Sequence, residues 1–245
     1  MAGAITNLKK FWHWLWNSES IWSYIIFLVL LFIIVKFIFL PGLGLVFGTS
    51  LPLAIVESSS MDHNSLNECN IVNGQKLCTP NYFICGQTSQ EKKSYNSEDY
   101  WNTCGKWYEK NTNITKEQFS NFKLSDGFRK GDIVIIFGRI NYQVGDVLVF
   151  NAGTGNPIIH RIISTNPLET KGDHNSEQLK VGNNAYTVDE TNIQSSQIIG
   201  VAVAKIPYLG WIKLGVVEHP LSSGIIILVI ILIFVFYSLK EKKDY

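Results

Sequence analysis

The fold is decided by two similar segments, Gly131-Asp132-Ile133-Val134-Ile135-Ile136-Phe137 and Gly145-Asp146-Val147-Leu148-Val149-Phe150. Each begins with a Gly-Asp turn and continues as a β-branched, apolar run, which is typical of a buried β-strand. Residues 157–163 and 198–206 predict two further strands, the first with a proline at its start, where a sheet tolerates it. We therefore predict a mainly β protein built on an antiparallel sheet.

Two long apolar segments flank this β region. Residues 21–40 contain one charge, Lys36, and are long enough to cross a bilayer as a helix that ends at Pro41-Gly42. Residues 221–239 predict a second transmembrane helix. A cleaved signal peptide is the alternative for the first segment, but its apolar run is too long and no small-residue cleavage site follows directly. A buried core helix is the alternative for the second.

Lysines outside the apolar segments indicate the topology. They are Lys9, Lys10, Lys240, Lys242 and Lys243. By the positive-inside rule both termini are cytoplasmic. Residues 1–20 then form a cytoplasmic and interfacial N-terminus, 41–220 an extracytoplasmic domain and 240–245 a cytoplasmic tail. We expect a multi-pass protein of the cell membrane. Its net charge of +1 gives no indication of a nucleic-acid partner.

Residues 62–127 differ in composition from the β region and predict a Cys-rich insertion. It contains every cysteine of the chain: Cys69, Cys78, Cys85 and Cys104. Outside the cytosol these are expected to pair, with three possible connectivities. A zinc site is the alternative, but no C-x-x-C pair occurs and we expect no metal. Asn113 begins an N-glycosylation triplet.

Aromatic residues are frequent in the insertion: Tyr100, Trp101, Trp107 and Tyr108. They predict a small local core, with a carbohydrate- or peptide-binding surface as the alternative. Residues 115–122 predict a short helix capped by Thr115. We expect no long amphipathic helix in the extracytoplasmic domain.

A serine of the Ser58-Ser59-Ser60 triplet, His160 and Asp173 are candidates for catalysis. The triplet follows residues 43–56, which should include a strand that leads into it. His160 lies in an apolar strand and is of the type that titrates near neutrality, as a general base must. Asp173 follows in a Gly-Asp turn, and a returning strand could bring it beside His160. A loop serine, a packed histidine and an Asx turn are the structural alternatives.

In their order along the chain, these segments resemble the type I signal peptidases, in the histidine-bearing branch found in archaea and in the endoplasmic-reticulum complex. The matching segments are Ser58-Ser59-Ser60-Met61, Gly145-Asp146-Val147-Leu148-Val149-Phe150, Pro157-Ile158-Ile159-His160-Arg161-Ile162, Thr170-Lys171-Gly172-Asp173-His174-Asn175, and Ile198-Ile199-Gly200 with Ile206-Pro207-Tyr208-Leu209-Gly210. The 62–127 insertion is more similar to that of archaeal members.

The resemblance implies a β catalytic domain of signal-peptidase type. It also implies a membrane-bound serine endopeptidase that removes signal peptides from exported preproteins after small-x-small motifs. Its partners would be signal peptides, the lipid bilayer and the protein-export machinery, and no cofactor is needed. The apolar run 51–56 could pair with an extended substrate. The alternatives are a catalytically inactive membrane-anchored binding or accessory subunit, and a related serine peptidase with a dedicated surface-protein substrate.

Carried over residue by residue, the resemblance makes Ser60 the nucleophile and His160 the general base. Asp173 would support His160, and Ser58 would help to hold the oxyanion. The chain departs from the family in two places: Asp62-His63-Asn64 replaces a usual proline, and Leu179 replaces a usual second aspartate. Other residues therefore stay open as acid or base: Glu177 and Asp189 as the acid, His63 and His174 as the base.

Overall fold

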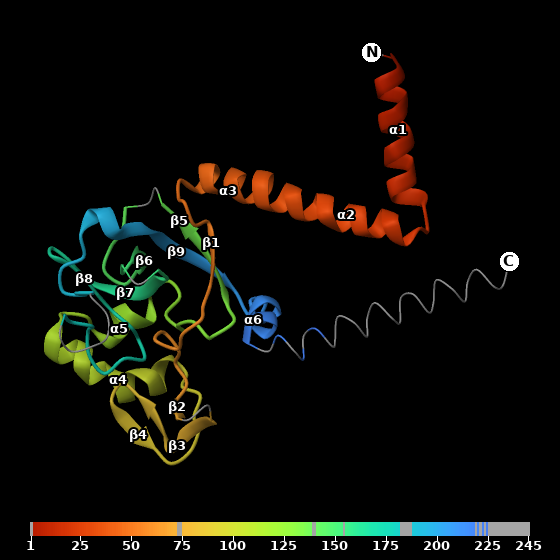
Figure 1. Cartoon of the computed structure of the whole chain (residues 1–245). Coiled ribbons are helices and arrows are strands. Elements are labelled where there is room, and N and C mark those ends of the chain that lie inside the picture. The colour runs from red at the N-terminus through yellow and green to blue at the C-terminus, as the bar shows by residue number, and fades with distance from the viewer. Residues whose placement is uncertain are drawn as a thin grey trace. The chain divides into compact units, whose positions relative to one another are not determined.

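The computed structural model describes residues 2–72, 75–138, 141–153, 155–181 and 188–218, with positions 220, 222 and 224. Its contacts divide the chain into two compact units (Figure 1). The first comprises Met1–Val46 and Gly215–Tyr245, and the second comprises Phe47–Leu214.

The described part of the first unit is mainly helical. It includes α1 (Ala2–Asn17), α2 (Ile21–Ile34), the π-helical turn η1 (Val35–Phe39) and α3 (Leu40–Phe47), with the last residues of α6 (Trp211–Glu218). From Ile21 to Phe47 the chain forms one apolar helix of 27 residues, which is long and apolar enough to cross a membrane. The predicted helix over 21–40 is therefore confirmed as a helix. The predicted second helix, over 221–239, and the tail 240–245 lie outside the described residues apart from Ser222 and Gly224.

The first apolar helix does not end at Pro41-Gly42 as predicted. Pro41 has no N–H to donate, and in a regular α-helix its ring would meet the carbonyl one turn earlier. Directly before it, the Leu40 N–H donates to Val35 O across the wider π-helical turn. Single π-helical turns of this kind occur within α-helices, and the chain remains helical to Phe47.

A six-stranded sheet dominates the second unit, in the order β1-β5-β9-β6-β7-β8 (Figure 1). Its strands are β1 (Leu53–Ile55), β5 (Ile133–Phe137), β6 (Val147–Asn151), β7 (Pro157–Thr165), β8 (Leu168–Lys171) and β9 (Ile198–Ile206). All its neighbouring pairs are antiparallel. The predicted strands and the mainly antiparallel β fold are confirmed. The two similar Gly-Asp segments are not neighbours, because β9 pairs with both.

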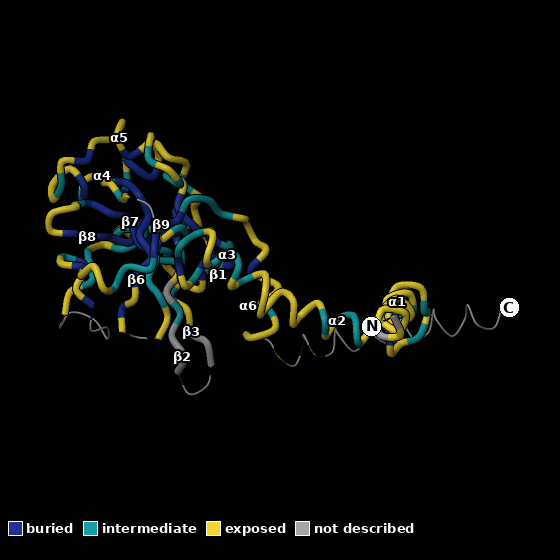
Figure 2. The backbone as a smooth tube through the Cα atoms, turned by 90° about the horizontal axis from the view of Figure 1, so that it is seen from above, coloured by how far each residue is buried: buried dark blue, intermediate teal, exposed yellow. Residues whose placement is uncertain are grey.

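Strand β6 shows why apolar and polar residues do not alternate in the predicted strands. Val147 and Val149 belong to one core cluster, whereas Leu148 and Phe150 belong to another. Successive side chains of a strand point to opposite faces, so both faces of this strand are covered. Figure 2 shows that many residues of the sheet are buried, in dark blue.

The insertion packs around a small core cluster that also includes Ile163 of β7. A second sheet joins β2 (Leu66–Val72), β3 (Gln75–Ile84) and β4 (Gln87–Ser89), followed by α4 (Ser97–Asn111) and α5 (Lys116–Ser120). The disulfides are Cys69–Cys78 and Cys85–Cys104, so no thiolate remains for the zinc alternative. Thr115 caps α5 as predicted, in a capping box with Gln118. The turn η2 (Ser195–Gln197) and helix α6 (Trp211–Glu218) complete the described elements.

Helix α4 corrects the prediction that the domain over residues 41–220 has no long amphipathic helix. It has 15 residues, and Asn96 begins it by accepting from the Asp99 N–H at 2.9 Å. Its buried face consists of Tyr100, Trp101, Cys104, Gly105 and Tyr108. Aromatic and cysteine residues interrupted by Asn, Thr and Gly do not resemble the aliphatic stripe by which amphipathic helices are recognised. The prediction of a local aromatic core is confirmed, because Tyr100 and Tyr108 are fully buried.

Candidate active site

Ser60 lies in a loop after β1, and its neighbour Met61 fixes this loop. The Met61 side chain is 2% exposed and belongs to the core of the sheet. The Phe128 N–H donates to Met61 O at 2.9 Å, and the His174 N–H donates to Ser60 O at 2.8 Å. Ser60 is half-buried, and its hydroxyl lies 3.3 Å from the Ser58 hydroxyl. Ser60 is thus held from both sides by backbone hydrogen bonds.

His160 lies on β7 and is 2% exposed. Its Nε2 approaches the Ser60 loop at Gly172. A Cβ atom at Gly172 would lie 2.8 Å from His160 Nε2 and 2.7 Å from Ser60 O, so only glycine fits between them. The hydrogen bonds of the described residues do not include one from Ser60 Oγ to His160 Nε2. In substrate-free sites, hydrogen bonds of this kind are often long and tighten when substrate binds.

Asp173 does not make the expected contact with His160 but binds Arg161. Arg161 Nε donates to Asp173 Oδ1 at 2.9 Å and Arg161 Nη2 donates to Oδ2 at 2.6 Å. His63 Nε2 lies 3.0 Å from Oδ2 of the same carboxylate. Burial alone would raise the pKa of Asp173, but the Arg161 charge and the hydrogen bonds from His63 and Arg161 hold it well below its usual range.

The geometry of β7 explains this partner. His160 and Arg161 are consecutive on the strand, so their side chains leave it on opposite faces. Arg161 pairs with Lys171 in the register of β7 and β8, and the chain after Lys171 turns toward the Arg161 face. Strand β8 therefore returns the chain to β7, as predicted. The alternation of side chains along β7 places Arg161, and not His160, on the face that Asp173 reaches.

Glu190 is the acid that contacts His160, and it is not among the acids predicted from the sequence. Its Oε1 forms a short hydrogen bond with His160 Nδ1, and the two side chains are 0% and 2% exposed. Thr170 Oγ1 donates to Glu190 Oε1 at 2.9 Å, and the Leu179 N–H donates to Oε2 at 2.6 Å. Leu179 is the residue that stands in place of the second aspartate usual in type I signal peptidases. No local motif marks Glu190, which follows His160 by 30 residues.

Of the remaining candidate acids and bases, Asp189, His174 and His63 have other partners, and Glu177 is exposed. Asp189 accepts from the Thr191 N–H and hydroxyl, and those bonds lower its pKa. His174 Nδ1 donates to Asp62 O at 2.9 Å, and burial lowers its pKa. His63 stacks on Tyr100 at a centroid distance of 3.8 Å.

The insertion supports the loop Gly172-Asp173-His174-Asn175, here called the 172–175 loop. Tyr100 and Tyr108 on α4 donate hydroxyl hydrogen bonds to Asp173 O and Asp173 Oδ1 at 2.8 and 3.2 Å. The Cys85 N–H donates to His174 O at 2.8 Å. Residues that the sequence assigns to a separate insertion therefore hold one wall of the candidate site.

Lys171 is buried directly before this loop. Its Nζ donates to Gly172 O at 3.0 Å and to Asn175 O at 2.7 Å, and it lies 4.9 Å from the centre of the Trp107 ring. Burial lowers the pKa of Lys171 to about 8, against the opposing effect of nearby Asp173 and Glu190. The amine thus links the 172–175 loop to α4.

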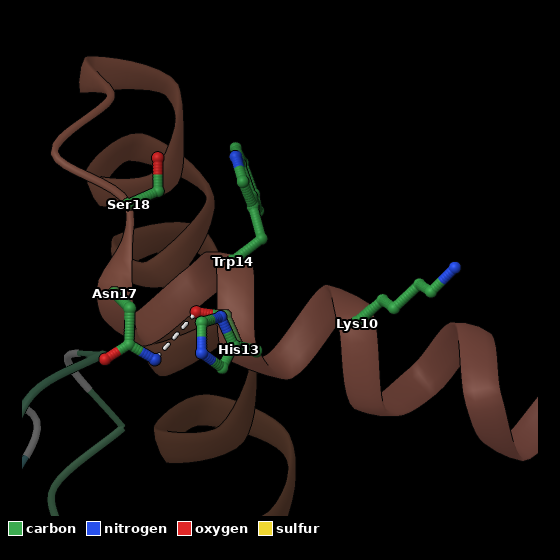
Figure 3. Close-up of a pocket in the computed structure, with 5 residues that line it drawn as sticks. All are labelled: Lys10, His13, Trp14, Asn17 and Ser18. Carbon is green, nitrogen blue, oxygen red and sulfur yellow. Dashed lines mark hydrogen bonds between the residues drawn. The ribbon is translucent and has the colours of Figure 1, made fainter.

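A separate hollow lies in the first unit, lined by Lys10, His13, Trp14, Asn17 and Ser18 (Figure 3). Asn17 Nδ2 donates to His13 O at 3.0 Å, and Ser18 Oγ accepts from the Ser20 N–H at 3.2 Å. These bonds complete the end of α1 and the turn into α2, which gives the polar groups a structural role.

The chain is similar to several proteins described as signal peptidase complex catalytic subunit SEC11. That of Pyricularia oryzae is 33% identical over 107 residues, which are 40% of this chain and 60% of that protein. That of Verticillium alfalfae is 30% identical over 123 residues, 44% of this chain and 70% of that protein. That of Metarhizium acridum is 29% identical over 107 residues. The chain spans 60% of the length of the first and third of these relatives. No family model matches it.

Proposed function

Because this chain belongs to the family of the signal peptidase complex catalytic subunits SEC11, we propose that it is a membrane-bound serine endopeptidase. Its substrates are exported preproteins, from which it removes signal peptides after small-x-small motifs. Ser60 is the nucleophile and His160 is the general base. The observation that carries the proposal is that the Ser60 carbonyl oxygen and His160 Nε2 both lie against Gly172, where there is no room for a side chain.

The chemistry follows from these two residues. His160 Nε2 takes the proton of the Ser60 hydroxyl as Oγ attacks the scissile carbonyl. The imidazolium then gives this proton to the leaving amine, and an acyl-enzyme ester remains on Ser60. Water, deprotonated by the same Nε2, hydrolyses the ester and returns Ser60 to its starting state. No metal takes part in these steps.

The oxyanion is held by the backbone N–H of Ser60 and by the Ser58 hydroxyl. The distance of 3.3 Å between the two hydroxyls supports this role for Ser58, because it puts a second donor beside the attacking oxygen. In comparable sites the loss of one such donor lowers kcat by about 10²–10³.

The substrate is bound as an added strand along β1. Strand β1 is an edge of the six-stranded sheet and leads directly into the serine loop. A signal peptide in extended form would align its backbone with Leu53 and Ile55 and bring its scissile bond to Ser60. This route explains why a short apolar edge strand precedes the nucleophile.

The membrane anchor is the apolar helix Ile21–Phe47, which supports access to substrates that emerge from a bilayer. We include in the proposal the second helix over 221–239, cytoplasmic termini and an extracytoplasmic catalytic domain. The relatives are named as subunits of a complex, so further subunits and the export machinery are its proposed protein partners.

The proposal is tested with the full chain in proteoliposomes and a preprotein whose cleavage site is Ala-x-Ala. Ser60→Ala and His160→Ala should each reduce cleavage by about 10⁴-fold or more. Ser59→Ala is the matched control, since Ser59 has the same side chain one position away, and it should stay within about twofold of wild type. His160→Lys should give little recovery. A lysine has one amine, which would be buried against Glu190, and it has no second nitrogen to face Ser60.

Full cleavage by Ser60→Ala would refute the serine mechanism. A wild-type protein that binds the preprotein but leaves it intact, even with its partner subunits, would instead support the inactive accessory subunit.

A further inference from the structure

The buried carboxylate of Glu190 is fully occupied by contacts that aim it at His160. One oxygen contacts His160 Nδ1 and accepts from Thr170 Oγ1, and the other accepts from the Leu179 N–H. The Glu190 backbone is fixed as well, because its N–H donates to Leu179 O at 2.9 Å and its carbonyl accepts from the Thr170 N–H at 3.0 Å. Neither the backbone nor the side chain has freedom to turn away from the imidazole.

This contact bears on which nitrogen of His160 can act as a base. A carboxylate at Nδ1 accepts a hydrogen bond, so it favours the tautomer with the proton on Nδ1. The lone pair is then on Nε2, the nitrogen that faces Gly172 and the Ser60 loop. When Nε2 takes a proton, the positive charge forms beside a carboxylate that water does not reach, where the attraction is strong.

Asp173 is not available for this role. Two Arg161 nitrogens bind its carboxylate, and Tyr108 and His63 contact the same two oxygens. Its charge is compensated within the buried Arg161 pair, on the other face of β7. The two acids thus have separate partners: Asp173 neutralises Arg161 and Glu190 faces His160.

We propose that Glu190 is the positioning residue of His160, which holds the imidazole with its proton on Nδ1 and stabilises the imidazolium during catalysis. This inference rests on the proposed peptidase function. Glu190 does not touch the substrate and neither gains nor loses a proton in the cycle. It acts through the histidine.

The test uses three variants of the full chain in proteoliposomes. Glu190→Gln keeps the size of the side chain but removes its charge, and it should lower kcat for preprotein cleavage by about 10²–10⁴-fold with little change in KM. Glu190→Asp retains a carboxylate and should recover part of this loss. Glu169→Gln is the matched control, because Glu169 lies beside Thr170 and accepts from Gln178 Nε2 at 3.1 Å but does not bind His160. It should stay within about twofold of wild type.

A measurement on the wild-type chain covers the case in which Glu190→Gln fails to fold. Histidine labelled with ¹⁵N reports the tautomer of each ring, and His160→Gln identifies the resonances of His160. We expect a protonated Nδ1 and an unprotonated Nε2 at a pH where the ring is neutral. A proton on Nε2 in an active wild-type enzyme would overturn the proposal, and so would a Glu190→Gln protein with the kcat of Glu169→Gln.

The two proposals fail in different ways. If wild-type protein with the Nδ1–H tautomer cleaves no preprotein, the peptidase function is wrong and the role of Glu190 in catalysis falls with it. If wild type cleaves and Ser60→Ala does not, only the Glu190 variants and the tautomer decide the assignment of Glu190.

Discussion

Arg161 and Asp173 form a bidentate ion pair in which both side chains are fully buried. The remaining Arg161 donors reach three backbone carbonyls, those of Lys123, Leu124 and Gly145. One side chain therefore connects the 172–175 loop to the end of the insertion and to the turn before β6. The pair fastens the loop that packs against Ser60.

Asp173→Asn should destabilise the protein by about 3–5 kcal/mol, because it leaves the buried Arg161 charge without a counter-charge. Asp126→Asn is the control: Asp126 pairs with Lys205 at 2.7 Å but is exposed, and its loss should cost no more than about 1 kcal/mol. Denaturant unfolding of the full chain in detergent measures both. Equal destabilisation by the two variants would contradict the structural role of the buried pair.

Because of the lowered pKa of Lys171, the free energy of unfolding should increase as the pH rises above about 8. The folded chain releases the Lys171 proton near pH 8, whereas the unfolded chain keeps it to the ordinary pKa of 10.5. Between these values the unfolded chain binds more protons, so the stability of the folded chain increases with pH. The free energy of unfolding should rise by roughly 2–3 kcal/mol by pH 10.5.

Thermal unfolding of wild type and Lys171→Met at pH 7 and pH 9.5 isolates this contribution. The rise with pH should be smaller in the variant. Cleavage by Lys171→Met should also fall, because Gly172 O and Asn175 O lose their shared donor. The same pH dependence in both proteins would show that Lys171 is charged throughout.

The apolar segments made most of the sheet predictable. The run Val147–Phe150 is buried on both faces, so burial alone requires each of its side chains to be apolar. The His160 strand was recognisable for the same reason, since its apolar neighbours belong to the core. In these segments the local pattern and the tertiary packing demand the same residues.

Helix α4 and Glu190 were not predictable from local patterns. The buried face of α4 is made of aromatic rings and a disulfide, which have no helical signature in sequence. Glu190 becomes a partner of His160 only because its backbone bonds to Thr170 and Leu179 bring a distant segment against β7. The choice between Asp173 and Glu190 depended on which face of β7 each loop reaches, and spacing along the chain does not contain that information.

The disulfide Cys85–Cys104 should matter for activity more than Cys69–Cys78. Cys104 lies on α4, and the Cys85 N–H holds the 172–175 loop through His174 O. Cys85→Ser with Cys104→Ser should cost about 2–4 kcal/mol of stability and lower the cleavage rate. Cys69→Ser with Cys78→Ser is the control, because that disulfide joins β2 to β3 within the insertion hairpin. Equal cleavage by the two double variants would show that the insertion does not support the site.

Strand β1 offers a direct test of substrate binding by strand addition. The Val56 N–H donates to Asp132 O and Pro52 O accepts from the Ile136 N–H, so alternate residues of this segment face β5. The Ala54 N–H also faces β5, whereas the N–H of Leu53 points to the open edge. Leu53→Pro should therefore leave the β1–β5 hydrogen bonds intact and remove a donor to the substrate.

We expect Leu53→Pro to raise KM for preprotein cleavage by about tenfold, the equivalent of one hydrogen bond of about 1–1.5 kcal/mol. Leu53→Ala keeps the N–H and reports the contribution of the side chain alone. Ala54→Pro removes a donor that faces β5, so it should lower stability instead. Steady-state cleavage with unfolding curves separates the three variants. If Leu53→Pro and Leu53→Ala have the same KM, the substrate does not pair with β1 at Leu53, and the signal peptide must enter the site along another edge.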